Sequence, residues 1–555
     1  LLGEMAALDF VSVSAEDDLS AVAAALPGQG RVVHFSRAAL GEDYDSALCR
    51  LFSSEIKKAA HDVKPLMRAL LAKEYPAEGF VFDTALAAYL IDPTQGHYEL
   101  ERLTVAYLSF EPEKPDPAGS GEEPAHPGAL RSRASAVSAL VPVLKKKLDA
   151  LGMTALHGEL ELPLCRVLAD MELCGVAVDR AALQEFGAML SGRIRDCQDA
   201  IFSYAGGEFN INSTRALGEV LFEKLGLPPV KKTKTGYSTN IDVLEKLRRH
   251  HPIVQSIIDY RMLTKLNSTY CEGLLKVIAP DGRIHTTFQN TVTATGRLSS
   301  TEPNLQNIPV RTELGSELRR MFVPRPGWVL VDADYSQIEL RVLAHIADDK
   351  LMQQAFLSGE DIHRATAAQV FGVAPEDVTP EMRRHAKAVN FGIVYGISEF
   401  SLAEDIGVSR AEAKAYIDSY LARYEGVRRY MHDIVEFARE NGYVATMFGR
   451  RRGLPDIHSR NFNVRSAAER IALNTPIQGT AADIIKRAML RTADALAPLR
   501  AQLVLQIHDE LIVECPREEA EQVRKLVTEA MEGAAQLAVP LSAEAKIGES
   551  WYDAK

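Results

Sequence analysis

Residues 329–341 (VLVDADYSQIELR) constrain the fold more than any other part of the chain. Residues 328–331 are apolar and partly β-branched, as in a strand that is buried in a sheet. Two carboxylates, Asp332 and Asp334, follow where burial should end, and a helical pattern begins soon after. A carboxylate at the end of a buried strand is costly unless it binds a cation or reaches solvent. Asp334 could equally cap the following helix, so this stretch alone leaves both readings open.

A second acidic segment lies at residues 506–511 (QIHDEL). Apolar residues flank it on both sides, which predicts a hairpin with Asp509 at its tip. If this hairpin lies beside the 328–334 strand, Asp334 and Asp509 converge and repel each other unless cations lie between them. Carboxylate ligands without cysteine favour Mg²⁺ over zinc, and two Mg²⁺ ions suit in-line displacement at phosphorus. A His-Asp pair by itself is more typical of a structural contact or of an unrelated metal-dependent hydrolase.

A third segment, RRHAKAVNFGIVYG at residues 383–396, has a helical pattern. Arg383, Lys387, Phe391 and Tyr395 are four residues apart and therefore share one slowly drifting face. A solvated charged face would not continue into Phe and Tyr, and a core face would not begin with Arg and Lys. The two cations could hold a triphosphate while the aromatic rings pack on a sugar or a base. His363 could add a further phosphate contact.

The net charge is −12 over 555 residues. A nucleic-acid-binding protein need not be basic overall, but it must then concentrate its positive charge locally. Residues 231–239 (KKTKTGYST) and 449–453 (GRRRG) are candidate clusters, although the first could also be an ordinary solvated loop. No run of about 18 apolar residues predicts a membrane span. Six cysteines without a Cys-x-x-Cys pair favour a reducing cytoplasm over a zinc ribbon or a disulfide framework.

The order of the predicted elements suggests several domains. Residues 1–110 alternate strands and helices as in an α/β domain, and 111–127 form a Pro- and acid-rich linker. Residues 135–195 are largely helical, and strands begin again at 283–288, before a long polar loop at 293–311. A helical block at 342–495 separates the 328–334 strand from strands at 503–507 and 511–514, a helix at 517–538 and a short terminal strand. We predict that the two sets of strands form one sheet, joined across the helical insertion.

Five segments together resemble the family A DNA polymerases. DYSQIELR, RRHAKAVNFGIVYG and QIHDE are similar to motifs A, B and C of that family, and the segments TATGRLSSTEPNLQNIPVR and NTPIQGTAADIIKRAM resemble it as well. The resemblance covers about residues 160–555. It implies an α+β multidomain fold, a right-hand polymerase of palm, fingers and thumb, after an RNase H-like α/β domain of the 3′–5′ exonuclease type. The implied boundaries are 1–155 for the exonuclease-like domain, 156–280 for the thumb, 281–345 and 481–555 for the palm, and 346–480 for the fingers.

The same resemblance implies a DNA-directed DNA polymerase that extends a primer with deoxynucleoside triphosphates, in gap filling and Okazaki fragment processing. It would be a cytoplasmic monomer with two Mg²⁺ ions, which Mn²⁺ can replace. The implied catalytic residues are Asp334, Asp509, Glu510 and Lys387, with metal bound by Asp334, Asp509 and the Tyr335 carbonyl. The implied nucleotide-binding residues are Arg383, Lys387, His363, Phe391, Tyr395, Gln337, Tyr335 and Glu339, the last as a steric gate against a ribose 2′-OH. The implied DNA-binding residues are Arg297, Arg311, Asn474, Gln478, His508, Arg470, Lys231, Lys232 and Lys234.

The N-terminal domain departs from the proofreading members of the family. The first candidate strand, at residues 8–14, has no Asp-x-Glu, and Pro65-Leu66 stand where Tyr-Asp is expected. The last exonuclease motif of the family is Tyr-x-x-x-Asp, and residues 135–144 contain neither Tyr nor Asp. Asp83 remains, but one acid alone cannot hold two metals. We therefore predict a vestigial domain without proofreading. The missing initiator Met and 5′ nuclease domain suggest a piece of a longer chain.

Three alternatives were weighed against this interpretation. A single-subunit RNA polymerase of the phage type shares the two aspartates, but Glu339 and the NFGxxYG pattern argue against it. A catalytically dead DNA-binding scaffold would have no need for Asp334 and Asp509. A nuclease would need the acids that the N-terminal domain lacks.

Overall fold

The computed structural model describes residues 1–110, 112, 127–230, 232–233, 236–309 and 312–555. Contacts between residues divide the chain into two compact units. The large unit consists of residues 1–174, 287–301 and 331–547, and the small unit of residues 175–286, 302–330 and 548–555. Among the helices of the described residues, none is both long and apolar enough to cross a membrane.

The N-terminal part of the large unit is built on a five-stranded sheet in the order β3-β2-β1-β4-β5, with its helices against it. The first three strands are antiparallel and the last two run parallel to β1, as an alternation of strands and helices predicts. This confirms an α/β arrangement for residues 1–110. The elements are α1 (Leu2–Ala6), β1 (Val11–Ala15), β2 (Ala21–Leu26), β3 (Arg31–Ser36), α2 (Arg37–Leu40), α3 (Asp43–Leu51), β4 (Lys58–Ala60), α4 (Val63–Ala72), β5 (Phe80–Asp83), α5 (Thr84–Ile91), α6 (Leu100–Leu108), α7 (Pro127–Leu151), the π-helical η1 (Leu156–Glu161) and α8 (Leu162–Cys174).

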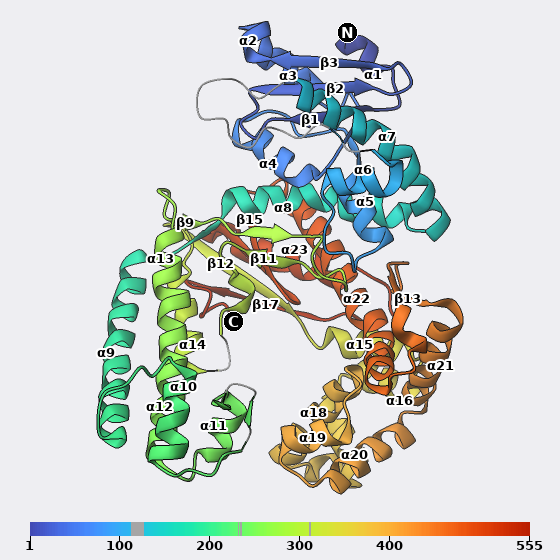
Figure 1. The fold of residues 1–555 in the computed structure, drawn as a ribbon. Helices are drawn as coiled ribbons and strands as arrows, with labels where there is room; N and C mark the ends of the chain where they lie inside the picture. Colours follow the sequence, from blue (N-terminus) through green and yellow to red (C-terminus); the bar gives the residue numbers. More distant parts are fainter. Residues whose placement is uncertain (111, 113–126, 231, 234–235, 310–311) are drawn as a thin grey trace. The chain divides into compact units, whose positions relative to one another are not determined.

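A four-stranded sheet, in the order β15-β16-β12-β17, is the centre of the large unit (Figure 1). It joins β12 (Trp328–Tyr335) to strands that follow the helical block, so the prediction of one sheet across the insertion is confirmed for this strand. It is wrong for the strands predicted at 283–288, which belong to two other sheets of two strands each. Helix α23 buries Val523, Val527 and Met531, which recur at helical spacing on one face, and it contacts both β16 and α22. The later elements are α22 (Phe462–Leu496), β15 (Gln502–Ile507), β16 (Glu510–Pro516), η8 (Arg517–Glu519), α23 (Ala520–Glu532) and β17 (Ala543–Gly548).

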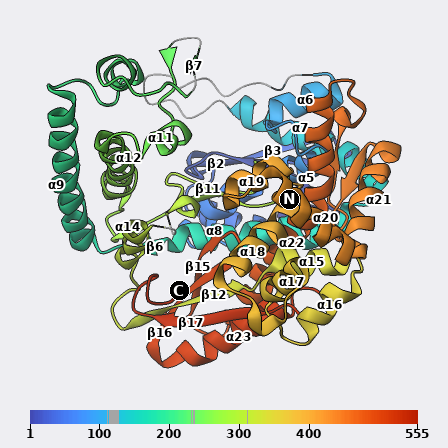
Figure 2. The same ribbon diagram turned by 90° about the horizontal axis from the view of Figure 1, so that it is seen from below.

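The insertion between β12 and β15 is largely helical, as predicted. Helices α17 and α18 pack side by side (Figure 2). Helix α18 begins after Thr379, which caps it, and ends at Val394, two residues before the end of the predicted segment, because Gly396 adopts a left-handed backbone with φ +65°. The elements are α15 (Ile338–Ile346), α16 (Lys350–Leu357), α17 (Ile362–Phe371), η6 (Pro375–Asp377), α18 (Pro380–Val394), α19 (Glu399–Ile406), α20 (Arg410–Arg423), α21 (Glu425–Asn441), β13 (Tyr443–Ala445), β14 (Arg451–Gly453) and η7 (Pro455–His458).

Two predicted segments differ from the structure. The predicted strand at 283–288 is interrupted into β9 (Arg283–Ile284) and β10 (Thr287–Gln289). The predicted polar loop at 293–311 contains a strand, β11 (Ser299–Thr301), which pairs with β10, and a 3₁₀ turn, η4 (Leu305–Asn307). The buried carboxylate of Glu172 accepts the Phe288 N–H at 2.9 Å, so a side chain rather than a longer strand satisfies that backbone group.

In the small unit, the long helices α9 and α12 lie against each other (Figure 1). Ser213 caps the helix that follows it by accepting the Ala216 N–H. The other elements are β6 (Val176–Ala177), α9 (Arg180–Ala205), α10 (Thr214–Gly218), the π-helical η2 (Glu219–Lys224), β7 (Lys232–Thr233), β8 (Gly236–Tyr237), α11 (Ile241–Leu247), α12 (Pro252–Lys265), the π-helical η3 (Leu266–Glu272), α13 (Gly273–Val277), α14 (Glu313–Glu317) and η5 (Leu318–Met321).

Candidate active site

The two acidic segments meet at one end of the central sheet. Strands β15 and β16 form a hairpin in which Ile507 pairs with Glu510, so His508 and Asp509 make the turn. His508 has φ +52°, a conformation that tight hairpin turns require. The Tyr335 N–H donates to the Asp509 carbonyl at 3.1 Å, which places the residue after Asp334 directly beside the turn. The predicted convergence of the two acid-bearing segments is therefore present in the fold.

Burial distinguishes the acids of this sheet end. Asp332 and Glu510 are 2% and 4% exposed, whereas Asp334 and Asp509 are partly exposed. The Tyr335 side chain points away from the turn, because its hydroxyl donates to the Met531 carbonyl at 2.6 Å. Burial raises the pKa of this phenol above its ordinary value, so it stays neutral. The backbone N–H of Tyr335, and not its hydroxyl, is therefore the group that contacts the turn.

A cavity of about 440 Å³ lies in the large unit beside this sheet end. Ten of its lining residues, from five distant segments, were predicted as site residues from the sequence. The lining also includes Ile338, Ala481 and Ala482, which were not predicted. The ten residues are Arg297, Gln337, Glu339, His363, Arg383, Lys387, Phe391, Tyr395, His508 and Asp509.

Helix α18 presents a basic and aromatic face to the cavity. Arg383 and Lys387 are exposed, while His385, Ala386 and Val389 on the opposite face are buried. The Arg383 guanidinium donates from Nε to Asp361 at 2.7 Å, which fixes its position at the start of α17. The Lys387 ammonium lies 6.0 Å from the centre of the Phe391 ring. The predicted face is thus present, with two cations available for an anionic ligand.

His363 lies deeper in the same cavity wall and is 3% exposed. Burial lowers its pKa to about 4, so the ring is neutral near pH 7. The Asn390 side-chain amide lies 3.0 Å from Nδ1, and because an NH₂ group can only donate, the ring proton is on Nε2. His363 can therefore offer a neutral N–H donor. Asn390, which orients it, was missed by the sequence analysis, where it is one polar residue inside an apolar helical face.

Glu339 is held by two partners although it is only 7% exposed. The Arg297 guanidinium donates to Oε1, and the Tyr395 hydroxyl donates to Oε2 at 3.0 Å. Burial, and then the Glu339 charge, raise the pKa of Tyr395 to about 12. These three side chains form one hydrogen-bonded unit in the lining of the cavity, a connection between residues 297, 339 and 395 that no local sequence pattern indicates.

Helix α22 carries three of the predicted DNA-binding residues at a spacing of four, namely Arg470, Asn474 and Gln478. The Asn474 amide donates to the Tyr395 carbonyl at 3.5 Å. At Gly396, a Cβ atom would lie only 3.1 Å from the Arg470 side chain. This face of α22 therefore lies directly against the end of α18.

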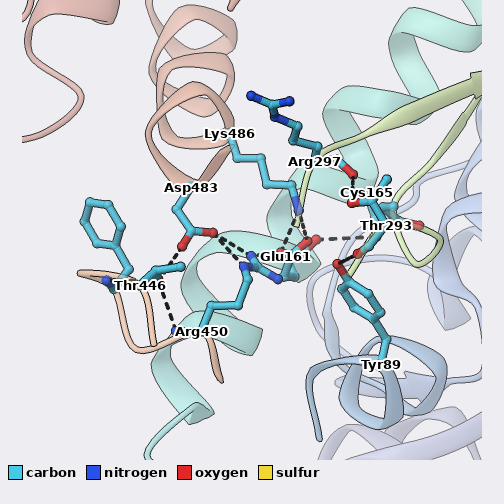
Figure 3. A network of polar contacts seen from close by, with 11 residues as sticks. Tyr89, Glu161, Cys165, Thr293, Arg297, Thr446, Arg450, Asp483 and Lys486 are labelled. Carbon is cyan, nitrogen blue, oxygen red and sulfur yellow. Dashed lines mark hydrogen bonds and ion pairs between the residues drawn. The ribbon is translucent and has the colours of Figure 1, made fainter. Parts of the chain in front are cut away.

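The basic clusters have different outcomes. Arg311, Lys231 and Lys234 lie outside the described residues, and Lys232 lies in β7, where only its backbone is described. In the 449–453 cluster the prediction is wrong for Arg450. This residue is 3% exposed and bound to Glu161 and Asp483 (Figure 3), because an unpaired buried guanidinium would be very costly.

In the N-terminal part, the remaining acid Asp83 has a structural role. It is 1% exposed and accepts the N–H groups of Asp62, Val63, Ala85 and Leu86. These bonds cap α5 and fix the start of α4. Its carboxylate oxygens are therefore already used by the backbone.

A sheet end with two acids, facing a basic helix across a cavity, is the architecture of a polymerase fold. Residues 180–553 match the model of DNA polymerase family A, and the chain belongs to this family. It is 51% identical over 511 residues to DNA polymerase I of Geobacillus stearothermophilus, covering 90% of this chain and 58% of that protein. It is 49% identical over 514 residues to DNA polymerase I of Bacillus subtilis (strain 168), covering 91% of this chain and 58% of that protein. The chain thus spans about 58% of the length of these curated relatives.

Among solved structures, the chain is similar to the POL domain of Pol1 from M. smegmatis in complex with DNA primer-template and dNTP. The TM-score is 0.93 at 41% sequence identity, and the match covers 100% of this chain and 97% of the other. The family A polymerase fold that the sequence motifs implied is therefore confirmed.

Proposed function

We propose that the chain is the large-fragment portion of a bacterial DNA polymerase I and adds deoxynucleotides to a primer 3′ end under the direction of a template. One observation carries the proposal: the segments of Asp334 and Asp509 meet beside a cavity that Arg383, Lys387 and His363 line. Family membership and the likeness to a structure with primer-template and dNTP support it. Gap filling and Okazaki fragment processing in the cytoplasm, by a monomer, are the cellular role we propose.

Two Mg²⁺ ions would be held by Asp334, Asp509 and the Tyr335 carbonyl. Within the described part of the chain, no three His, Cys, Asp or Glu side chains form a ready metal cage. Mg²⁺ fits such a sparse donor set, because it keeps several waters and commonly binds one or two carboxylates together with substrate phosphates. When bound, the ions would activate the primer 3′-oxygen and stabilise the leaving pyrophosphate. Mn²⁺ would substitute for them.

The other cavity residues have roles in binding the incoming nucleotide. Arg383 and Lys387 would hold the triphosphate as charge-assisted donors, and neutral His363 would add an N–H donor. Lys387 would protonate the leaving pyrophosphate. Phe391 would pack on the nucleotide, and Tyr395 would lie near the template base. Closure of the helical insertion on a correct pair would complete the site. Glu510 would be an accessory acid, and Gln337 would line the nucleotide site.

DNA would be bound by residues that read its shape. Arg297, Gln478 and His508 would contact the minor groove or the primer terminus. The hydrogen-bond acceptors of the minor groove are nearly the same for every base pair, so such contacts are possible with any sequence. Arg470 and Asn474 would support this surface, and Arg311 and the 231–234 lysines would bind phosphates. We assign residues 1–155 to the exonuclease-like domain and residues 156–280 to the thumb. The palm consists of residues 281–345 and 481–555, and the fingers of residues 346–480.

Replacing Glu339 by Ala should relax sugar selection. The buried Glu339 carboxylate would occupy the space that a ribose 2′-OH needs, so we expect the preference for deoxynucleotides to fall about 10- to 100-fold. The measurement is kcat/KM for one deoxynucleotide and its ribonucleotide in single-nucleotide primer extension. Glu339→Gln keeps the side-chain volume and is the matched control. An unchanged ratio in Glu339→Ala would refute the gate.

No proofreading is expected. Val13, Leu66 and Val137 come from the three segments that lack the exonuclease acids, and all three line one cavity of about 740 Å³. Acids that also line it, such as Glu16 and Asp62, stand at other positions. A labelled primer with a mismatched 3′ end, incubated with Mg²⁺ and no nucleotides, should keep its length. A parallel reaction with a paired primer and dNTPs shows that the enzyme is active, and Mg²⁺-dependent shortening would contradict the prediction.

A further inference from the structure

The turn at residues 293–297 carries Arg297 to its contact with Glu339. Four of its five residues are partly exposed, and no strand or helix includes it. Such a segment has no ladder of hydrogen bonds to fix it. The position of the Arg297 guanidinium therefore depends on what holds this turn.

One side of the turn is held by Tyr89, a residue of α5 in the N-terminal part (Figure 3). The Tyr89 hydroxyl donates to the Thr293 carbonyl at 2.8 Å, and the Thr293 hydroxyl donates to the Arg297 carbonyl at 2.6 Å. Tyr89 is 1% exposed, and a buried hydroxyl is costly without a partner. A phenylalanine would fill this core equally well, so the hydroxyl is explained by the bond to Thr293.

The turn also contacts Arg450. A Cβ atom at Gly296 would lie 2.6 Å from Arg450 Nε, so the turn lies directly on the guanidinium. Arg450 donates to Asp483 at 2.9 and 2.7 Å and also to Glu161, which precedes α8 (Figure 3). The turn therefore contacts the hydroxyl of Tyr89, from α5, and the buried guanidinium of Arg450, whose partner Glu161 comes from η1.

We propose that Tyr89 is a positioning residue that aligns Arg297 with Glu339, so that the N-terminal domain contributes to sugar selection. The proposal rests on the proposed polymerase function. Tyr89 acts on Arg297 through Thr293, and Arg297 in turn holds the Glu339 carboxylate against Tyr395. A domain without the exonuclease acids then keeps a role in the polymerase reaction, which accounts for a polar contact between residues 204 positions apart.

The test is Tyr89→Phe with Tyr98→Phe as the matched control. Both tyrosines lie in the same core with their rings 5.8 Å apart, and the Tyr98 hydroxyl donates to the Asp92 carbonyl, away from the turn. We expect Tyr89→Phe to lower the ratio of kcat/KM for a deoxynucleotide to that for its ribonucleotide by about 3- to 10-fold, the worth of one buried hydrogen bond. We expect Tyr98→Phe to leave this ratio at the wild-type value although it loses a hydrogen bond of its own. Equal ratios in the two variants would overturn the proposal.

A second pair of variants tests the same path without changing the N-terminal core. Thr293→Val removes the hydroxyl that donates to Arg297 and should lower the ratio of kcat/KM for the deoxynucleotide to that for the ribonucleotide in the same way. Thr293→Ser keeps a hydroxyl donor and should have the wild-type ratio. Failure of Ser to restore what Val loses would overturn the path. If the wild-type chain extends and selects deoxynucleotides while Tyr89→Phe is unchanged, only the positioning role fails. If the wild-type chain does not extend at all, the proposed function fails and the positioning role with it.

Discussion

Asp334→Asn and Asp509→Asn should each lower primer extension about a thousandfold or more. Each change keeps the shape of the side chain and removes a carboxylate from one of the two segments whose backbones meet at the end of the central sheet. Metal-assisted stabilisation of the transition-state charge contributes several kcal/mol, and about 1.4 kcal/mol corresponds to tenfold in rate. Single-nucleotide extension of a labelled primer with saturating dNTP and Mg²⁺ measures the effect.

Binding of primer-template should survive these two changes, since neither Asp334 nor Asp509 is among the proposed DNA contacts. Fluorescence anisotropy of labelled DNA checks this point. Asp433→Asn, which changes an exposed aspartate of α21, is the control for loss of one negative charge and should extend primers normally. A rate near that of wild type in either Asp334→Asn or Asp509→Asn would refute the two-metal assignment.

The sequence predicted the central sheet and its acids because their patterns are local. An apolar run that ends in Asp334 predicts one strand, and the apolar runs on both sides of Asp509 predict two more. Only the pairing of the first strand with this hairpin then has to be inferred. Likewise, the four-residue spacing of Arg383, Lys387 and Phe391 fixes which face of α18 they share. Periodicity along one segment was sufficient in each case.

Contacts between distant segments could not be predicted in this way. The basic run at 449–453 indicated a surface cluster, but Arg450 is buried, because Asp483 and Glu161 supply compensating charges from segments 33 and 289 residues away. Asn390 and Tyr89 also look like ordinary core residues until their partners are known. A buried polar group is defined by its partners, and a single sequence does not contain that information.

Glu161→Gln should lower the free energy of unfolding by about 3–5 kcal/mol, since it leaves the buried Lys486 ammonium without its counter-charge and Arg450 with Asp483 alone. Both Glu161 oxygens accept hydrogen bonds from the Lys486 ammonium, at 2.7 and 3.0 Å, and Arg450 binds the same carboxylate. Glu161 and Lys486 are both 0% exposed. Denaturant unfolding followed by far-UV circular dichroism measures the loss. A change below about 1 kcal/mol, the range of an exposed ion pair, would contradict the prediction.

Two comparisons separate the charge effect from loss of packing. The double variant Glu161→Leu with Lys486→Met replaces the pair by apolar groups and should recover most of the loss, because well-packed apolar residues often replace a buried pair without penalty. Glu4→Gln breaks the exposed pair with Arg31 and should change the free energy of unfolding by at most about 1 kcal/mol.

The free energy of unfolding should also depend on pH through the charge of Glu161. Burial alone raises the pKa of Glu161, but Lys486 and Arg450 outweigh it and hold this pKa below its ordinary value of 4.5. A carboxyl with a lowered folded-state pKa contributes stability that is fully present above 4.5 and is lost as the pH falls through the folded-state value. Wild-type stability should therefore fall below pH 4.5 more steeply than that of Glu161→Gln, and the two unfolding free energies should converge in acid. Parallel curves would mean that Glu161 stabilises the fold by its shape and not by its charge.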